Sequence, residues 1–201
     1  MTRIFLALPA LLFLGACQEE NGTAPEYRPE EAGTVDHALC LLGFAAVPVQ
    51  KVDPGHHLID ARINGQSGKF VLDTGANLTV VDASRAERFG LSADGGALAG
   101  LSGVLSAGAA GSATPTRIDS LKLGPITIRQ SRVVVADLGQ LLTALSRVSG
   151  EEVSGIIGQD VLNEHRAIID VSRPMLYLLE EDEDLAPVSA ERCQQADESR
   201  E

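Results

Sequence analysis

A short apolar stretch, Phe70-Val71-Leu72, runs directly into Asp73-Thr74-Gly75-Ala76. A strand that ends here would fix the Asp73 carboxylate in place. Gly75 would then permit a sharp turn and the close approach of a second backbone, and the Thr74 hydroxyl could hold a neighbouring segment. Two carboxylates that share one site cannot both ionise easily, so one acts as an acid while the other acts as a base. The tripeptide alone favours a simpler interpretation, an aspartate that caps a turn, because Asp is common in turns.

A second segment supports the interpretation of Asp73 as a residue that does acid–base chemistry. Gly155-Ile156-Ile157-Gly158 is an apolar run with a glycine at each end, and Gln159-Asp160-Val161-Leu162 after it predicts a short helix. Asn64-Gly65 predicts a tight hairpin turn before the Asp73 strand. Two further strands are expected at Ala167-Ile168-Ile169-Asp170 and Leu176-Tyr177-Leu178. In this order the motifs resemble the retropepsin-like aspartic proteases, which include a bacterial single-lobe aspartyl protease family, over residues 52–180.

The resemblance implies a mainly β, single-lobe acid protease barrel with two or three short helices. It implies an aspartic endopeptidase with Asp73 as the catalytic residue, water as the nucleophile, and no metal or cofactor. Active-site support would come from Thr74, Gly75, Ala76, Ile157 and Gly158. Because the chain has a single Asp-Thr-Gly, two copies of Asp73 would meet on the axis of a homodimer. The implied substrate is an extended protein or peptide segment.

The Gly, Ala and Ser residues between Ser92 and Thr114 stand where this family has its flap, a glycine-rich hairpin that closes over the peptide. The segment departs from the family, because Leu98 to Ala113 has few strand-forming residues, no aromatic residue and no obvious tight turn. A flap and a plain linker both remain open.

Strands and short helices are expected around these motifs. Alternating or β-branched runs predict strands at 57–63, 69–72, 78–81, 117–123, 126–128, 131–136, 153–158, 167–171 and 175–179. Helices are expected at 82–90, with Asp82 as N-cap and Gly90 as stop, and at 138–148 and 160–165. His56 and His57 have no accompanying ligand cluster and are interpreted as a turn before a strand.

The amino terminus predicts export and lipidation. Arg3 precedes an apolar run, Ile4 to Leu14, that is shorter than the roughly 20 residues needed to span a bilayer. Leu14-Gly15-Ala16-Cys17 resembles a bacterial lipobox, in which the cysteine becomes the lipidated first residue; the alternative is an ordinary secretory signal. Gln18 after the cysteine implies the outer membrane, so the protein would face the periplasm at the cell envelope.

The expected organisation is a lipoprotein signal at 1–16, a tether at 17–35, the protease domain at 36–180 and an acidic disordered tail at 181–201. The termini therefore lack the interleaved strands through which this family usually dimerises. Cys40 and Cys193 remain after cleavage, and in an oxidising periplasm they could form one disulfide or stay as two thiols.

Composition excludes several classes of protein. The 201 residues are 44% apolar and 22% charged, which is typical of a globular chain. A formal net charge of −12 with 3% aromatic residues argues against a nucleic-acid partner. Two alternatives to the peptidase hypothesis remain: a non-catalytic peptide- or protein-binding lipoprotein on the same fold, and a structural lipoprotein, for which the acid at Asp73 has no physical need.

Overall fold

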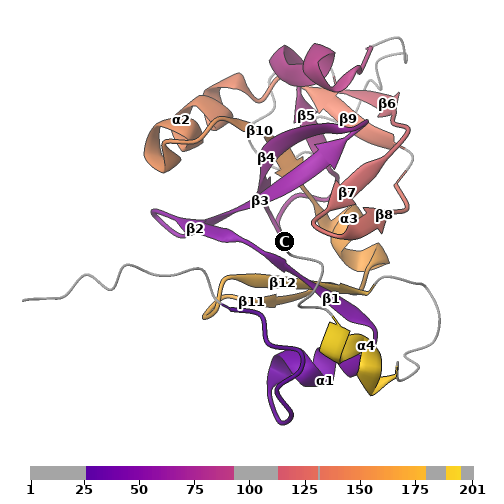
Figure 1. Ribbon diagram of the computed structural model, residues 1–201. Coiled ribbons are helices and arrows are strands. Elements are labelled where there is room, and N and C mark those ends of the chain that lie inside the picture. Colours follow the sequence, from indigo (N-terminus) through magenta and orange to yellow (C-terminus); the bar gives the residue numbers. More distant parts are fainter. Residues whose placement is uncertain (1–25, 93–112, 131, 180–188, 196–201) are drawn as a thin grey trace, which may run out of the picture.

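The computed structural model describes residues 26–92, 113–130, 132–179 and 189–195. This part of the chain is mainly β with short helices, which confirms the expected fold class (Figure 1). The signal at 1–16, Cys17, the first part of the tether and residues 93–112 of the expected flap lie outside the described residues. No helix in the described ranges is long and apolar enough to cross a bilayer.

The larger sheet has nine strands in the order β6-β9-β5-β10-β4-β3-β7-β8, with β2 paired to β3. Its strands are β2 (Gln50–Val52), β3 (His56–Ile63), β4 (Gln66–Leu72), β5 (Val80–Asp82), β6 (Thr114–Arg117), β7 (Leu121–Leu123), β8 (Ile126–Ile128), β9 (Arg132–Ala136) and β10 (Val153–Ile157).

The centre of this sheet explains why β4 ends where it does. β10 lies between β4, to which it is parallel, and β5, to which it is antiparallel. All five residues of β10 are buried, as expected for a strand covered on both faces. The Asn64-Gly65 turn joins β3 to β4 with positive φ angles of 49° and 79°, which a hairpin turn of this kind requires. The turn sets the register that buries Phe70 and Val71.

The smaller sheet has the order β1-β12-β11, with β1 (Phe44–Pro48), β11 (Ile168–Asp170) and β12 (Met175–Leu179). Figure 1 shows it below the larger sheet, with α1 (Val35–Leu41) and α4 (Ala190–Gln195) beneath it. A disulfide between Cys40 and Cys193 joins these two helices, with a Cα–Cα distance of 5.9 Å.

A buried carboxylate fixes α1 against the smaller sheet. The Asp36 side chain, 2% exposed, accepts hydrogen bonds from the Tyr177 hydroxyl, the Arg173 guanidinium and the Arg28 amide. Burial alone would raise the pKa of Asp36, but these donors outweigh it and lower the pKa. The donors therefore keep Asp36 ionised inside the protein.

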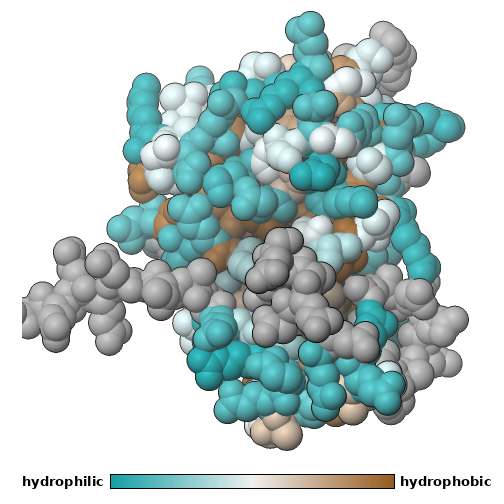
Figure 2. Space-filling view, viewed as in Figure 1, coloured by the Kyte–Doolittle hydropathy of each residue, from teal (hydrophilic) through white to brown (hydrophobic). Residues whose placement is uncertain are grey.

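Three further helical elements complete the fold: the 3-10 helix η1 (Ala83–Phe89), α2 (Gly139–Ser149) and α3 (Gln159–Glu164). They match the expected helices, and Asp82 and Gly90 cap η1 as predicted. Figure 2 shows a largely hydrophilic surface, with hydrophobic residues reaching it between the larger sheet and the lower layer.

Three expectations about local structure were wrong. The single strand expected at 117–123 is two strands, β6 and β7, because the amides of Asp119 and Ser120 donate to the Asn64 side chain at 2.7 and 3.2 Å and turn the chain. Residues 190–195 of the expected disordered tail form α4, which the disulfide holds. Residues 26–34 of the expected tether contact α1, where Thr34 is the N-cap.

Candidate active site

Asp73 stands at the end of β4, beside the last residue of β10. Its amide donates to the Ile157 carbonyl at 3.1 Å, which continues the β4–β10 pairing by one residue. The side chain is half-buried, and its Oδ1 accepts a hydrogen bond from the Gly75 amide at 2.8 Å. Two backbone contacts therefore hold a carboxylate that still reaches solvent.

The loop after Asp73 crosses the start of α3 at very short range. The Gln159 amide donates to the Ala76 carbonyl at 2.8 Å, and the Gln159 side-chain amide donates to the Thr74 carbonyl at 2.7 Å. A Cβ on Gly158 would lie 2.5 Å from the Leu78 carbonyl oxygen, so only glycine fits there.

This crossing corrects the expected role of Gly75. The close approach of a second backbone occurs at Gly158. At Gly75 the neighbour of an added Cβ is the Asp73 carboxylate oxygen, at 3.1 Å. Thr74 is joined to α3 through its carbonyl, where we expected its hydroxyl. Thr74, Gly75, Ala76, Ile157 and Gly158 all belong to the two segments that meet at Asp73.

Asp160 also stabilises the crossing between the Asp73 loop and α3. Its carboxylate accepts hydrogen bonds from the Thr79 amide and hydroxyl at 2.9 and 2.8 Å, and from the Gln130 side-chain amide at 2.7 Å. The Thr79 hydroxyl in turn accepts from the Gly158 amide at 3.1 Å. Sequence reasoning assigned Asp160 only to the start of a helix. Its contacts to Thr79 join residues 81 positions apart and leave no local signal.

Asp73 opens into a cavity of about 500 Å³. Apolar side chains form most of its walls: Val71, Leu72 and Ile156 from the sheet, Leu141 and Leu145 from α2, and Ile169 and Val171 from β11 and the turn after it. A cavity of this size and lining suits a peptide side chain beside the carboxylate.

Gly55, His56 and His57, where the β2–β3 hairpin turns into β3, close the remaining side of the cavity. The Nε2 atom of His57 is buried and has no hydrogen-bond partner among the described residues. Burial lowers the pKa of His57, and the nearby Lys51 and His56 lower it further. We expected His56 and His57 to form a turn before a strand. They are instead the first two residues of β3, and the cavity that they line is built from segments far apart in the chain, so no local pattern predicted it.

Neither the cysteines nor a metal cluster contributes to this cavity. Cys40 and Cys193 lie in α1 and α4, away from the residues that line it. In the ranges that the structure describes, no group of three His, Cys, Asp or Glu side chains lies close enough to hold a metal ion.

Comparison with known proteins identifies the family of this chain. The family model described as aspartyl protease matches residues 59–161, which contain Asp73 and the whole crossing with α3. The chain belongs to the aspartyl protease family. No curated protein matches it significantly by sequence.

Solved structures with a similar chain path include a retropepsin-like aspartic protease from Rickettsia conorii, at 18% identity and a TM-score of 0.48, covering 67% of this chain and 90% of that one. The protease of EIAV, solved with the inhibitor HBY-793, has 20% identity and a TM-score of 0.39, covering 61% and 99%. The retroviral protease-like domain of Ddi1 from Leishmania major has 18% identity and a TM-score of 0.39, covering 66% and 94%.

Proposed function

We propose that the protein is an aspartic endopeptidase that hydrolyses peptide bonds in extended protein segments. The observation that carries the proposal is the position of Asp73. Backbone contacts at the end of β4 hold its carboxylate, which faces a cavity of about 500 Å³ with largely apolar walls.

The proposed reaction uses two copies of Asp73 that share one proton. The ionised carboxylate takes a proton from water as the oxygen attacks the peptide carbonyl carbon, and the protonated carboxyl gives its proton to the carbonyl oxygen. The tetrahedral intermediate then collapses as its C–N bond breaks. The carboxyl that took the water proton gives it to the leaving nitrogen, and a hydroxyl of the intermediate returns a proton to the other carboxylate, so that a carboxyl and an amine form and the pair again holds one proton. Proton sharing suits two carboxylates at short range, because both cannot ionise easily.

The second carboxylate comes, in this proposal, from a second copy of the chain. Within the described ranges β11 is an edge strand, since it pairs only with β12. Ile168 at the start of β11 and Val171 directly after its last residue are 40% and 63% exposed, and Val171 also lines the cavity beside Asp73. Antiparallel pairing of two β11 edges is self-complementary, as a twofold axis requires, and would cover these apolar side chains.

The test is cleavage of a denatured protein mixture by the full-length chain, from acid to neutral pH, with new termini mapped by mass spectrometry. Asp73→Asn is the matched variant, because it keeps the shape of the side chain and removes the base. We expect cleavage by the wild type and none by Asp73→Asn. Absence of cleavage by a folded dimer at every pH would overturn the proposal and favour a peptide-binding role.

We also propose that the protein is a lipoprotein of the bacterial cell envelope, anchored through Cys17 in the outer membrane and facing the periplasm. The support is the lipobox-like sequence that ends at Cys17. Membrane fractionation of cells that express the wild type or Cys17→Ala tests it. We expect the wild type in the outer-membrane fraction and the variant to be lost from it.

A further inference from the structure

The wall of the cavity opposite α2 is chemically distinct from the rest. It is the β2–β3 hairpin, where His56 and His57 line the cavity. In the described part of the chain, Asp73 is the one carboxylate among the lining residues, and no hydrogen bond or ion pair joins it to His56 or His57.

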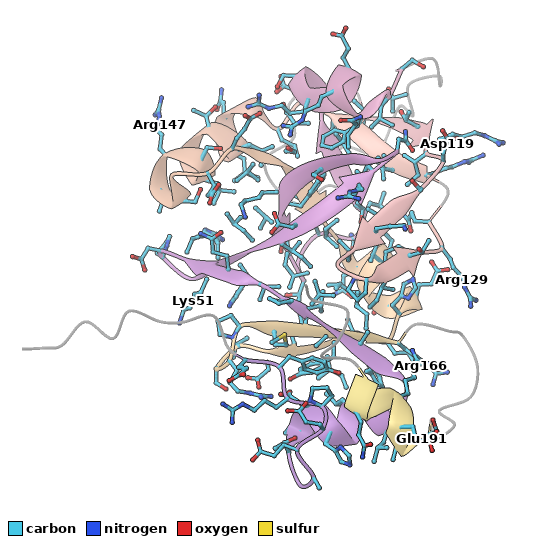
Figure 3. All side chains as sticks on the ribbon, in the orientation of Figure 1. Lys51, Asp119, Arg129, Arg147, Arg166 and Glu191 are labelled. Carbon is cyan, nitrogen blue, oxygen red and sulfur yellow. A yellow bond between two sulfur atoms is a disulfide. The ribbon has the colours of Figure 1, made fainter. Side chains whose placement is uncertain are left out.

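Lys51 adds a positive charge on the same face as His57. The two residues are directly opposite in the β2–β3 pairing, and opposite residues of an antiparallel pair project to the same side. Figure 3 shows Lys51 extending from β2 toward the level of the three-stranded sheet, while Arg147 on α2 points away from the hairpin. Lys51 forms no ion pair with any residue in the described ranges.

The environment of His57 also lacks a compensating anion. Its Nε2 is buried and has no hydrogen-bond partner among the described residues. Burial is the main cause of its lowered pKa, and the nearby Lys51 and His56 contribute; no carboxylate is among the causes. A buried polar atom without a partner costs free energy, so a ligand group that reached Nε2 would gain a hydrogen bond there. Two basic side chains with no anion between them favour an anionic ligand.

We propose that His57 and Lys51 form a carboxylate-binding subsite, which selects peptides with an acidic group near the bond that is cleaved. The carboxylate comes from a Glu or Asp side chain or from a free C-terminus. It accepts a hydrogen bond from His57 Nε2 and pairs with the Lys51 ammonium. This inference rests on the proposed peptidase function, because it describes the specificity of the cavity that His57 lines. Lys51 is not a lining residue and stands beside His57 in the β2–β3 pairing.

The experiment measures peptide binding and cleavage separately. The probe is a synthetic set of fluorescently labelled dodecapeptides with Leu-Leu at the centre and Ala elsewhere. One flanking position at a time is Glu, Gln or Lys, and shorter members end in a free carboxylate or an amide. Binding is measured with the full-length Asp73→Asn protein, which would not cleave them, and kcat/KM is measured with the wild type.

A hydrogen bond to a charged group is among the stronger ones, so we expect about tenfold tighter binding of Glu than Gln peptides at one position. Lys51→Gln and His57→Gln should each remove most of that preference. Lys122→Gln in β7 and His37→Gln in α1 are matched controls outside the cavity, and both variants should keep the preference for Glu over Gln peptides.

The result separates the two proposals. Equal affinity for Glu and Gln peptides, no binding of any peptide, or a preference that survives both variants would overturn the subsite. Preferential binding that depends on Lys51 and His57 without any cleavage by the wild type would support the subsite and overturn the peptidase. Preference for the free C-terminus over its amide, with no preference for internal Glu, would assign the subsite to chain ends.

Discussion

The crossing between the Asp73 loop and α3 gives a quantitative prediction for Gly158→Ala. The backbone angles at Gly158, φ −105° and ψ −173°, are open to any residue, so an added methyl group is opposed by contacts alone. Its Cβ would lie 2.5 Å from the Leu78 carbonyl oxygen and 2.9 Å from the Ala76 carbonyl oxygen, whereas ordinary contact begins at 3.4 Å.

Relief of this overlap moves the two segments apart by about 0.9 Å, the difference between 3.4 and 2.5 Å. That movement breaks the 2.8 Å hydrogen bond from the Gln159 amide to the Ala76 carbonyl and strains the bond between Asp73 and Ile157. Overpacking costs about 1–3 kcal/mol and each lost hydrogen bond about 1 kcal/mol, so we expect a loss of about 2–5 kcal/mol.

Urea unfolding followed by circular dichroism measures this loss. Gly139→Ala is the matched control, because its Cβ would meet only the end of the Asp137 side chain, and its stability should change by no more than about 1 kcal/mol. Displacement of Asp73 by nearly 1 Å should also reduce peptidase activity about a hundredfold. Wild-type stability and activity in Gly158→Ala would refute the reasoning that this contact positions Asp73.

Three further predictions follow from the described contacts. Asp36→Asn should lower the free energy of unfolding by about 3–5 kcal/mol, because it breaks a buried charged network. Since the donors lower the pKa of Asp36, the wild type should lose this stability as the pH falls below about 4. Urea titrations at several pH values should show a weaker acid dependence for the variant than for the wild type. Cys193→Ser should lower stability by about 2–5 kcal/mol under oxidising conditions and by little in dithiothreitol, because the bond to Cys40 closes a loop of 153 residues. Asp160→Asn should cost about 1–3 kcal/mol, because an amide cannot accept from all the donors that surround the carboxylate, Gln130 among them; calorimetry measures the shift in Tm.

The parts of the site that could be predicted are those that short sequence patterns specify. Asp73-Thr74-Gly75 follows a strand, Gly158 ends another, and Asn64-Gly65 sets the hairpin between β3 and β4. Each pattern depends on residues within a few positions of one another, so turn chemistry and burial in the same short segment determine the structure.

The missed parts depend on contacts between distant segments. The Asp160 carboxylate meets Thr79 across 81 positions, and α4 packs on α1 through a disulfide that spans 153 positions. The acidic residues before α4 predicted disorder, since a charged run rarely supports a helix on its own. A six-residue helix is marginal without tertiary contacts, and here the buried Cys193 provides one.

The smaller sheet offers the proposed dimer an edge at which two copies of the chain could pair. β12 covers one edge of β11 and β1 pairs with the other edge of β12, so the three strands of the smaller sheet come from one chain. The other edge of β11 keeps its backbone groups free of strand pairing in the described residues, and Val171 beside it lines the cavity of Asp73. A second copy that pairs there would extend the sheet and close the cavity in one step. In the proposed enzyme, dimerisation and assembly of the catalytic pair are therefore the same event, and activity would depend on concentration wherever the monomer is populated.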